Sequence, residues 1–344
     1  MSRSRAFHSL LVLLALFWAG AAAAGPGGGK LTVGYQLIYN PWKVAIAEGA
    51  FEAATGREIE WRRFDSGSKV LAAMASGGLE IGLAGSSPIA AGVSRGIDMQ
   101  LFWIVEDIGA AEALVVRDGS GIVEFEDLVG KKLGVPFAST THYHALFALE
   151  HFGVDPAALQ IVNMQPNQIA AAWLRGQIDA AFVWNPALGR IKESGRVLIT
   201  SGELSALGRP TFDGLVVDRV FAAANRDFMV RFVEVLAAAD EAYRSRPEAW
   251  TPDSAEVRAI VSLVGGTPED VPEVLALYNF PTLAEQASER WLGGGRDGAA
   301  ARALRATAQF LKDQKKIPAL QPDYGRFVTP EYAEAALANA DPHP

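Results

Sequence analysis

The stretch VPFASTTHY, residues Val135–Tyr143, predicts the unit from which this fold is built, a strand that turns directly into a helix. An apolar strand ends at Pro136, and small hydroxyl residues then lead into a helical pattern with apolar residues at Leu146 and Leu149. A helix that begins here presents unpaired backbone N–H groups, the positive end of its dipole and several hydroxyls to one point. Taken alone, the pattern is typical of an ordinary helix N-cap.

The same unit occurs a second time in the chain. The expected strand Leu79–Ala84 turns at Gly85–Pro88 (GSSP) into a helix that holds Ile89 and Val93. Neither turn contains a lysine or an arginine. Two hydroxyl-rich helix starts without cations suit a small, permanently charged anion that is held by neutral donors. The pair of turns, each after a strand, therefore predicts an anion site.

Strands and helices alternate over most of the chain, which is typical of an α/β fold with parallel-type sheets covered by helices. A first alternation covers about the first hundred residues, a second runs over 132–200, and helical patterns dominate after residue 226. We therefore expect two half-similar α/β units, the second inserted within the first. The elements needed below are expected strands at 31–35, 59–64, 79–84, 99–105, 113–117 and 178–184, and expected helices at 42–52, 226–245, 255–265 and 299–315.

The N-terminal segment has the pattern of an export signal. Arg3 and Arg5 precede the apolar stretch Leu10–Trp18, and small residues follow, so we expect cleavage after Ala24 and a soluble, exported protein. The chain has no cysteine, which excludes a disulfide framework and a lipid-bearing cysteine. A formal net charge of −8 argues against nucleic acid and anionic membranes as partners. With 50% hydrophobic residues, the exported chain can bury the cores of two domains.

Short motifs along the whole exported chain, in this order, resemble those of the taurine-binding periplasmic proteins of ABC importers. The motifs are Phe64–Gly67, Gly85–Pro88, Glu112–Val116, Val135–Tyr143, Ala171–Trp173, Val183–Trp184 and Thr307–Lys312. The resemblance implies a two-lobed periplasmic binding protein of type II, with residues 25–116 and 214–344 in lobe 1 and residues 117–213 in lobe 2. It implies two hinge crossings, near Val116-Arg117 and Asp213-Gly214, and a ligand between the lobes.

The resemblance also implies a function and partners. The protein would be a monomeric periplasmic component that captures taurine or a closely related aminosulfonate and delivers it to the permease and ATPase of an importer. It would carry no cofactor and no metal.

The resemblance assigns a role to particular residues. It places the sulfonate against the hydroxyl-bearing helix starts, which here carry Ser86, Ser87, Ser139, Thr140 and Thr141. It places the ammonium against Asp213, with Glu112 and Trp184 on the pocket wall, and Gln36, Tyr39 and Tyr143 are further candidates. The chemistry agrees, because a sulfonate offers only acceptor oxygens, which uncharged donors satisfy, while an ammonium needs a carboxylate or an aromatic face.

Each pocket candidate also has a structural reading. Asp213 could be a turn residue beside Gly214, Trp184 a core aromatic residue, and Glu112 a solvated or ion-paired hinge residue. The loop Leu37–Trp42 and the residue Leu215 depart from the family pattern, which leaves a different sulfonate or another small zwitterion as an alternative ligand.

Two other classes of function fit the sequence less well. Of the closely spaced histidines His142, His144 and His151, the first two do not face each other on a helix, and no cysteine or third ligand completes a metal site. An enzyme of the pyrimidine-synthase-like branch of the fold is the other alternative. The sequence has no nucleophile-elbow or phosphate-loop motif to support it.

Overall fold

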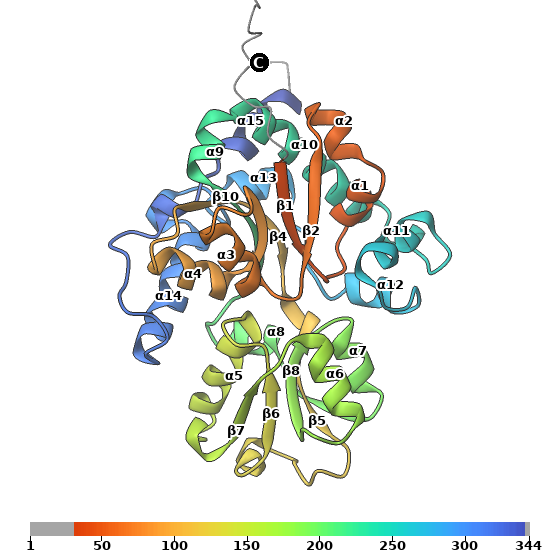
Figure 1. Ribbon diagram of the computed structural model, residues 1–344, viewed down its shortest axis with the longest axis vertical. Coiled ribbons are helices and arrows are strands. Elements are labelled where there is room, and N and C mark those ends of the chain that lie inside the picture. The colour runs from red at the N-terminus through yellow and green to blue at the C-terminus, as the bar shows by residue number, and fades with distance from the viewer. Residues whose placement is uncertain (1–30, 341–344) are drawn as a thin grey trace, which may run out of the picture. The chain divides into compact units, whose positions relative to one another are not determined.

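The computed structural model describes residues 31–340 and builds them around two five-stranded sheets, each flanked by helices (Figure 1). The predicted α/β fold with two lobes is confirmed. The expected signal peptide lies outside the described residues. Within residues 31–340, no helix is long and apolar enough to cross a membrane.

The first sheet has the strand order β2-β1-β3-β10-β4. Its first three strands are parallel, whereas β10 runs antiparallel to both β3 and β4, so the sheet is mixed. Buried apolar side chains fill β3 and most of β4, as expected for strands covered on both faces. The strands are β1 (Leu31–Gln36), β2 (Ile59–Phe64), β3 (Ile81–Gly85), β4 (Met99–Asp107) and β10 (Phe212–Asp218).

Eleven named α-helices within the described residues belong to the first lobe. They are α1 (Trp42–Ala47), α2 (Ala50–Thr55), α3 (Gly67–Ala75), α4 (Ser86–Ser94), α9 (Arg219–Ala224), α10 (Arg226–Ser245), α11 (Ala255–Val264), α12 (Asp270–Leu275), α13 (Leu283–Ala287), α14 (Ala299–Asp313) and α15 (Glu331–Ala340). The single helix expected over 42–52 is wrong. Gly49, in the left-handed conformation with φ of 68°, ends α1 and starts α2.

The second sheet has the strand order β7-β6-β8-β5-β9. Here β6 is parallel to β7 and β8, while β5 is antiparallel to β8 and β9. The strands are β5 (Glu112–Arg117), β6 (Lys132–Val135), β7 (Gln160–Asn163), β8 (Ala180–Trp184) and β9 (Gly195–Thr200). The helices are α5 (Thr140–His151), α6 (Pro166–Leu174), α7 (Ala187–Lys192) and α8 (Ser201–Ala206).

The chain passes between the sheets at two segments. The first is residues 108–111, between β4 and β5, and the second is residues 207–211, between α8 and β10. The hinges expected near residues 116 and 213 therefore fall inside β5 and β10, because β5 pairs along its whole length with the second sheet. The strand expected over 113–117 was correct, but its sheet could not be read from its own residues.

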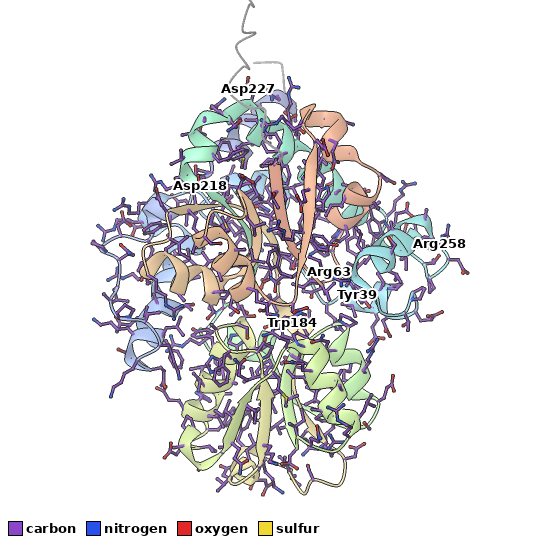
Figure 2. All side chains as sticks on the ribbon, in the orientation of Figure 1. Tyr39, Arg63, Trp184, Asp218, Asp227 and Arg258 are labelled. Carbon is purple, nitrogen blue, oxygen red and sulfur yellow. The ribbon has the colours of Figure 1, made fainter. Side chains whose placement is uncertain are left out.

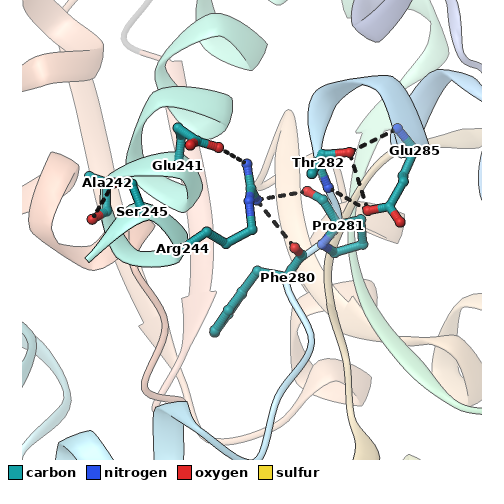
Figure 3. A network of polar contacts seen from close by, with 8 residues as sticks. All are labelled: Glu241, Ala242, Arg244, Ser245, Phe280, Pro281, Thr282 and Glu285. Atoms are coloured by element: carbon teal, nitrogen blue, oxygen red, sulfur yellow. Dashed lines mark hydrogen bonds and ion pairs between the residues drawn. The ribbon is translucent and has the colours of Figure 1, made fainter. Parts of the chain in front are cut away.

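Arg244 of α10 holds the segment that precedes α13 (Figure 3). Arg244 Nη1 donates to the carbonyl oxygens of Phe280 and Pro281, at 3.2 and 3.0 Å, and Nη2 pairs with Glu241 at 2.8 Å. Directly after this clamp, Thr282 caps α13 through a reciprocal pair of hydrogen bonds with Glu285. The clamp fixes the segment that leads from α12 to the last helices.

Candidate ligand-binding site

A narrow cavity of about 10 Å³ lies where strands of both sheets meet the starts of α4 and α5. Gly85 and Pro88, from the start of α4, form part of its wall. Six of the residues predicted from the sequence also line it: Gln36, Glu112, Ser139, Thr140, Trp184 and Asp213. The structure therefore brings together residues that lie far apart in the chain.

Gly85 allows the two helix starts to approach each other. A Cβ atom at this position would lie 2.7 Å from Thr140 Cγ2 and 3.1 Å from Asp213 Oδ1, so only glycine fits without a shift of its neighbours. Thr140 belongs to the second lobe and Asp213 to the first sheet, so these groups enclose the cavity from two sides. Next in the chain, the Ser86 hydroxyl accepts from the backbone N–H of Phe212 at 3.4 Å.

The hydroxyl groups at the start of α5 are already partly engaged. Ser139 Oγ donates its hydrogen to Pro136 O at 2.6 Å and accepts from the backbone N–H of His142 at 3.0 Å, so Ser139 is a true N-cap. Ser139 has only one hydroxyl hydrogen, so in its 2.8 Å hydrogen bond with Thr141 Oγ1 the donor is Thr141. Thr140 Oγ1 instead donates to Glu112 Oε1, at 2.6 Å.

Glu112 is the first residue of β5 and lies directly opposite Trp184, the last residue of β8. Its side chain is buried, with Oε1 against Thr140 and Oε2 at 3.1 Å from Ser201 Oγ. Burial, and then the negative charge of Asp213, raise the pKa of Glu112 to about 8, while the hydrogen bond that Thr140 donates acts in the opposite direction. Figure 2 labels Trp184.

Asp213 lies on β10 between Gly85 of β3 and Glu106 of β4. Burial raises the pKa of Asp213 to about 6, and a hydrogen bond with Glu106 and the charge of Lys43 oppose this rise. The pKa of Glu106 rises well above its usual value, because Glu106 is buried and faces Asp213. Their shared hydrogen bond raises the pKa of Glu106 and lowers that of Asp213, so the two carboxyls titrate as a pair in which Asp213 is the more acidic.

A chain of buried polar groups extends behind Asp213. Lys43 Nζ donates to Asn40 Oδ1 at 3.0 Å, and Asn40 Nδ2 donates to Glu106 Oε2 at 3.4 Å. The Lys43 ammonium also lies 4.1 Å from the centre of the Trp42 ring, and burial lowers the pKa of Lys43 to about 7. Sequence reasoning missed these residues. The available signals were a lysine inside an apolar helical pattern and a glutamate at the end of an apolar strand.

The remaining candidates do not line this cavity. Ser87 and Thr141 are buried beside it, and Tyr39 donates to Gly265 O at 3.2 Å (Figure 2). Tyr143 packs in the core of the second lobe, with its ring centre 5.2 Å from that of Phe310 on α14. Among residues 31–340, no group of three or more His, Asp or Glu side chains is arranged to hold a metal ion.

A second, outer cavity of about 180 Å³ is also lined by Trp184. Its wall is mostly apolar, with Leu37, Ala187 and Val264, and it also contains Asp65 and Arg190. Leu37 belongs to the loop Leu37–Trp42, which departs from the family pattern. This departure therefore changes the wall of the outer cavity. The inner and outer cavities share Trp184 as a wall.

Comparisons with known proteins place this geometry in a family. Residues 42–250 match the family model described as NMT1/THI5 like. The taurine-binding periplasmic protein of Escherichia coli (strain K12) is 38% identical over 305 residues, which are 89% of this chain and 93% of that protein.

Two solved structures share the fold. One is the alkanesulfonate-binding protein of Xanthomonas axonopodis pv. citri bound to MOPS, with a TM-score of 0.70, 24% identity, and coverage of 88% of this chain and 97% of that one. The other is the periplasmic aliphatic sulphonate binding protein of Escherichia coli, with a TM-score of 0.69, 20% identity, and coverage of 89% and 99%. The chain belongs to the NMT1/THI5-like family, and to the same family of periplasmic binding proteins as the taurine-binding protein of Escherichia coli.

Proposed function

We propose that this protein is the solute-binding component of an ABC importer and that it captures taurine, or a closely related aminosulfonate, between its lobes. One observation carries the proposal. A buried acidic side chain, Asp213, lines the same narrow cavity as the starts of α4 and α5. The cavity thus offers one negative group and two sets of helix-start N–H donors, which complements a ligand with one ammonium and one sulfonate.

The sulfonate end would lie against the helix starts. Backbone N–H groups there are unpaired within the helix, and Thr140 adds a hydroxyl that can turn from Glu112 toward the ligand. The Ser139 hydroxyl contributes little in this scheme, because its hydrogen is committed to Pro136 O. Ser86 and Ser87 are the first two residues of α4, and their backbone N–H groups would be the donors from the first lobe to the sulfonate.

The ammonium end would lie against Asp213, with the Trp184 ring as an aromatic wall. The chain Lys43–Asn40–Glu106 supports the Asp213 carboxylate from behind. Gln36, whose Nε2 donates to Leu83 O at 3.1 Å, completes the polar wall on the side of β1.

The same proposal covers processing, location and partners. Residues 1–24 would direct export to the periplasm and be removed after Ala24, and the remaining chain would act as a monomer. The two lobes would hinge at residues 108–111 and 207–211. The closed, ligand-bound form would then deliver its cargo to the permease and ATPase of the importer. The family resemblance and the named relatives support this reading.

A thermal-unfolding screen of residues 25–344 tests the proposal. The panel is taurine, hypotaurine, ethanesulfonate, longer alkanesulfonates, β-alanine and sulfate. A ligand that binds only the native state raises the free energy of unfolding by about 4 kcal/mol at a thousand times its Kd. We expect taurine to give the largest shift and ethanesulfonate a smaller one. The absence of a shift with every sulfonate would exclude the proposed ligand class, and a preference for the longer alkanesulfonates would point to the outer cavity.

A further inference from the structure

A second chain of buried polar groups begins at Glu112 and ends on a backbone carbonyl. Glu112 Oε2 lies 3.1 Å from Ser201 Oγ, Ser201 Oγ lies 2.8 Å from His144 Nδ1, and His144 Nε2 lies 2.8 Å from Arg209 O. The three side chains come from β5, α8 and α5, and all three are buried. Nothing in the proposed binding scheme uses Ser201 or His144.

The hydrogen bond between His144 and Arg209 fixes where the hydrogens of this series of groups lie. A carbonyl oxygen can only accept, so His144 Nε2 carries a hydrogen and donates it to Arg209 O. The His144 ring is fully buried and its pKa is lowered by burial to about 4, so the ring is neutral and its Nδ1 is an acceptor. Ser201 must then donate its one hydrogen to Nδ1.

The near end follows from the same count. Because the Ser201 hydrogen points to His144, Ser201 Oγ faces Glu112 Oε2 with a lone pair, and a hydrogen bond at this contact needs its hydrogen on Glu112. Thr140 donates to the other carboxyl oxygen, Oε1, which fits the carbonyl oxygen of a protonated acid. The alternative, an imidazolium and a carboxylate joined through Ser201, would bury two charges in place of none.

We propose that His144 and Ser201 are positioning residues that hold Glu112 as an uncharged acid, so that the anion subsite at the start of α5 has no negative side chain. This inference rests on the proposed function for its ligand, a sulfonate beside Thr140. It leaves Asp213 as the single ionised carboxylate among the cavity's lining residues and matches it to the single ammonium. Ionisation of Glu112 would place a like charge beside the sulfonate and repel it.

The groups that face Glu112 are consistent with this state. The titratable or charged ones are Asp213 on β10, His144 on α5 and Tyr278 after α12. Arg209 supplies only its carbonyl, because its guanidinium lies 4.9 Å from the centre of the Phe147 ring. Over residues 31–340, no ion pair of Glu112 with a lysine or arginine is found. No cation therefore favours the ionised form.

The test measures affinity for ethanesulfonate, which has no amine to titrate, from pH 6 to pH 9.5. In the wild-type protein we expect a loss of affinity of at least about tenfold between pH 7 and pH 9.5, because Glu112 ionises near pH 8. Whatever its affinity at pH 7, Glu112→Gln should show no such loss between pH 7 and pH 9.5, because its amide does not titrate and can still donate to Ser201 and accept from Thr140.

Two histidine variants separate positioning from mere packing. His144→Leu frees the Ser201 hydrogen for the Glu112 carboxylate, so the loss of affinity should move to lower pH by about one unit. His144→Gln can accept from Ser201 and donate to Arg209 O, so it should restore the wild-type midpoint. His151→Leu is the matched control, because His151 lies on the same helix but does not belong to this series of hydrogen-bonded groups. A wild-type affinity that does not change up to pH 9.5, or a Glu112→Gln variant whose affinity falls over this range as the wild type's does, would overturn the proposal.

A measurement without ligand keeps this test separate from that of the proposed function. A carboxyl whose pKa is raised on folding stabilises the protein fully below its unfolded value of about 4.5, and this contribution disappears as the pH rises through about 8. Thermal unfolding of the free proteins should therefore show Glu112→Gln gaining stability over the wild type between pH 5 and pH 8.5. An equal pH profile for both would contradict the protonated state, even if no sulfonate binds. Failure of every sulfonate to bind, with this gain present, would remove only the proposed ligand.

Discussion

At the scale of single residues, Gly85 sets how closely the starts of α4 and α5 can approach each other. A methyl group there would lie within 3.1 Å of both Thr140 and Asp213 atoms, one in each lobe. Neither neighbour can retreat without changing the cavity, because Thr140 is tied to Glu112 and Asp213 lies within a sheet.

Gly85→Ala should therefore weaken taurine and ethanesulfonate alike, by at least about tenfold, or about 1.4 kcal/mol. Calorimetric titration of both ligands measures this. Gly189→Ala on α7 is a suitable control, because its new methyl group would meet only Asn185 and Asp270 side chains, which are not among the cavity's lining residues. Unchanged affinity in Gly85→Ala would mean that the ligand does not need this close approach.

The titration of Asp213 should make the affinity for taurine fall at acid pH. The pKa of Asp213 is raised to about 6, so Asp213 takes up a proton as the pH falls through that value and ceases to be a counter-ion for the ammonium. The affinity for taurine should fall about tenfold between pH 7 and pH 5, the change in the ionised fraction of such a group. The affinity for ethanesulfonate should not follow it. A taurine affinity that is flat over this range would place the ammonium elsewhere.

Sequence reasoning found the residues that line the cavity but missed the residues behind them. Asp213, Glu112, Thr140 and Trp184 stand in motifs at the ends of strands, where α/β proteins bind ligands. Glu106, Lys43 and His144 act through partners that are distant in the chain, and no local pattern predicts such contacts. The resemblance supplied the ligand class, while the roles of these buried groups needed coordinates.

At the scale of elements, the hydroxyl groups at the start of α5 differ in their partners. Ser139 Oγ caps the helix through His142 N and bonds Pro136 O, whereas Thr140 Oγ1 faces the cavity and bonds Glu112. The reading as an ordinary cap therefore applies to Ser139, and the side chain that bonds the cavity residue Glu112 is that of its neighbour Thr140.

Two substitutions should separate these roles. Ser139→Ala should lower the free energy of unfolding by about 1 kcal/mol, the usual value of an N-cap, and change sulfonate affinity by less than about threefold. Thr140→Val should change the free energy of unfolding little but lower the affinity for sulfonates by about tenfold, since one hydrogen bond to a charged group is worth about 1.5–3 kcal/mol. Denaturant unfolding and calorimetry give the two numbers. If Ser139→Ala weakens binding more than Thr140→Val does, this division of roles is wrong.

Element types were predictable because their periodicity is local. The helix expected over 226–245 has those bounds, and those expected at 255–265 and 299–315 differ from the structure by one and two residues at the C-terminus. Errors arose where a backbone conformation or a pairing partner decided the outcome. Gly49 divides one expected helix, and β5 joins a sheet whose other strands follow it in the chain.

At the scale of the whole molecule, the proposed function requires the lobes to close around the ligand. A ligand shifts such an equilibrium only through contacts that it makes more strongly in the closed form. Contacts from both α4 and α5 to one sulfonate would meet this condition, because the two helices belong to different lobes.

Small-angle scattering tests this bridging role. The wild type should compact on saturation with taurine, and Thr140→Val should remain more open at the same saturation, because it loses a second-lobe contact. Thr141→Val is the matched control, since Thr141 bonds Ser139 and does not line the cavity, and it should compact like the wild type. Full compaction of saturated Thr140→Val would assign closure to the ammonium end or to backbone N–H groups.

The most direct test of the account is calorimetry of wild type and Asp213→Asn with taurine and ethanesulfonate at pH 7. The account predicts that Asp213→Asn weakens taurine by about 10- to 100-fold, because a charge-assisted hydrogen bond in a desolvated site is lost. It predicts that ethanesulfonate, which has no ammonium, changes by less than about threefold. Equal weakening of both ligands would contradict it, since Asp213 would then shape the cavity without recognising the amine.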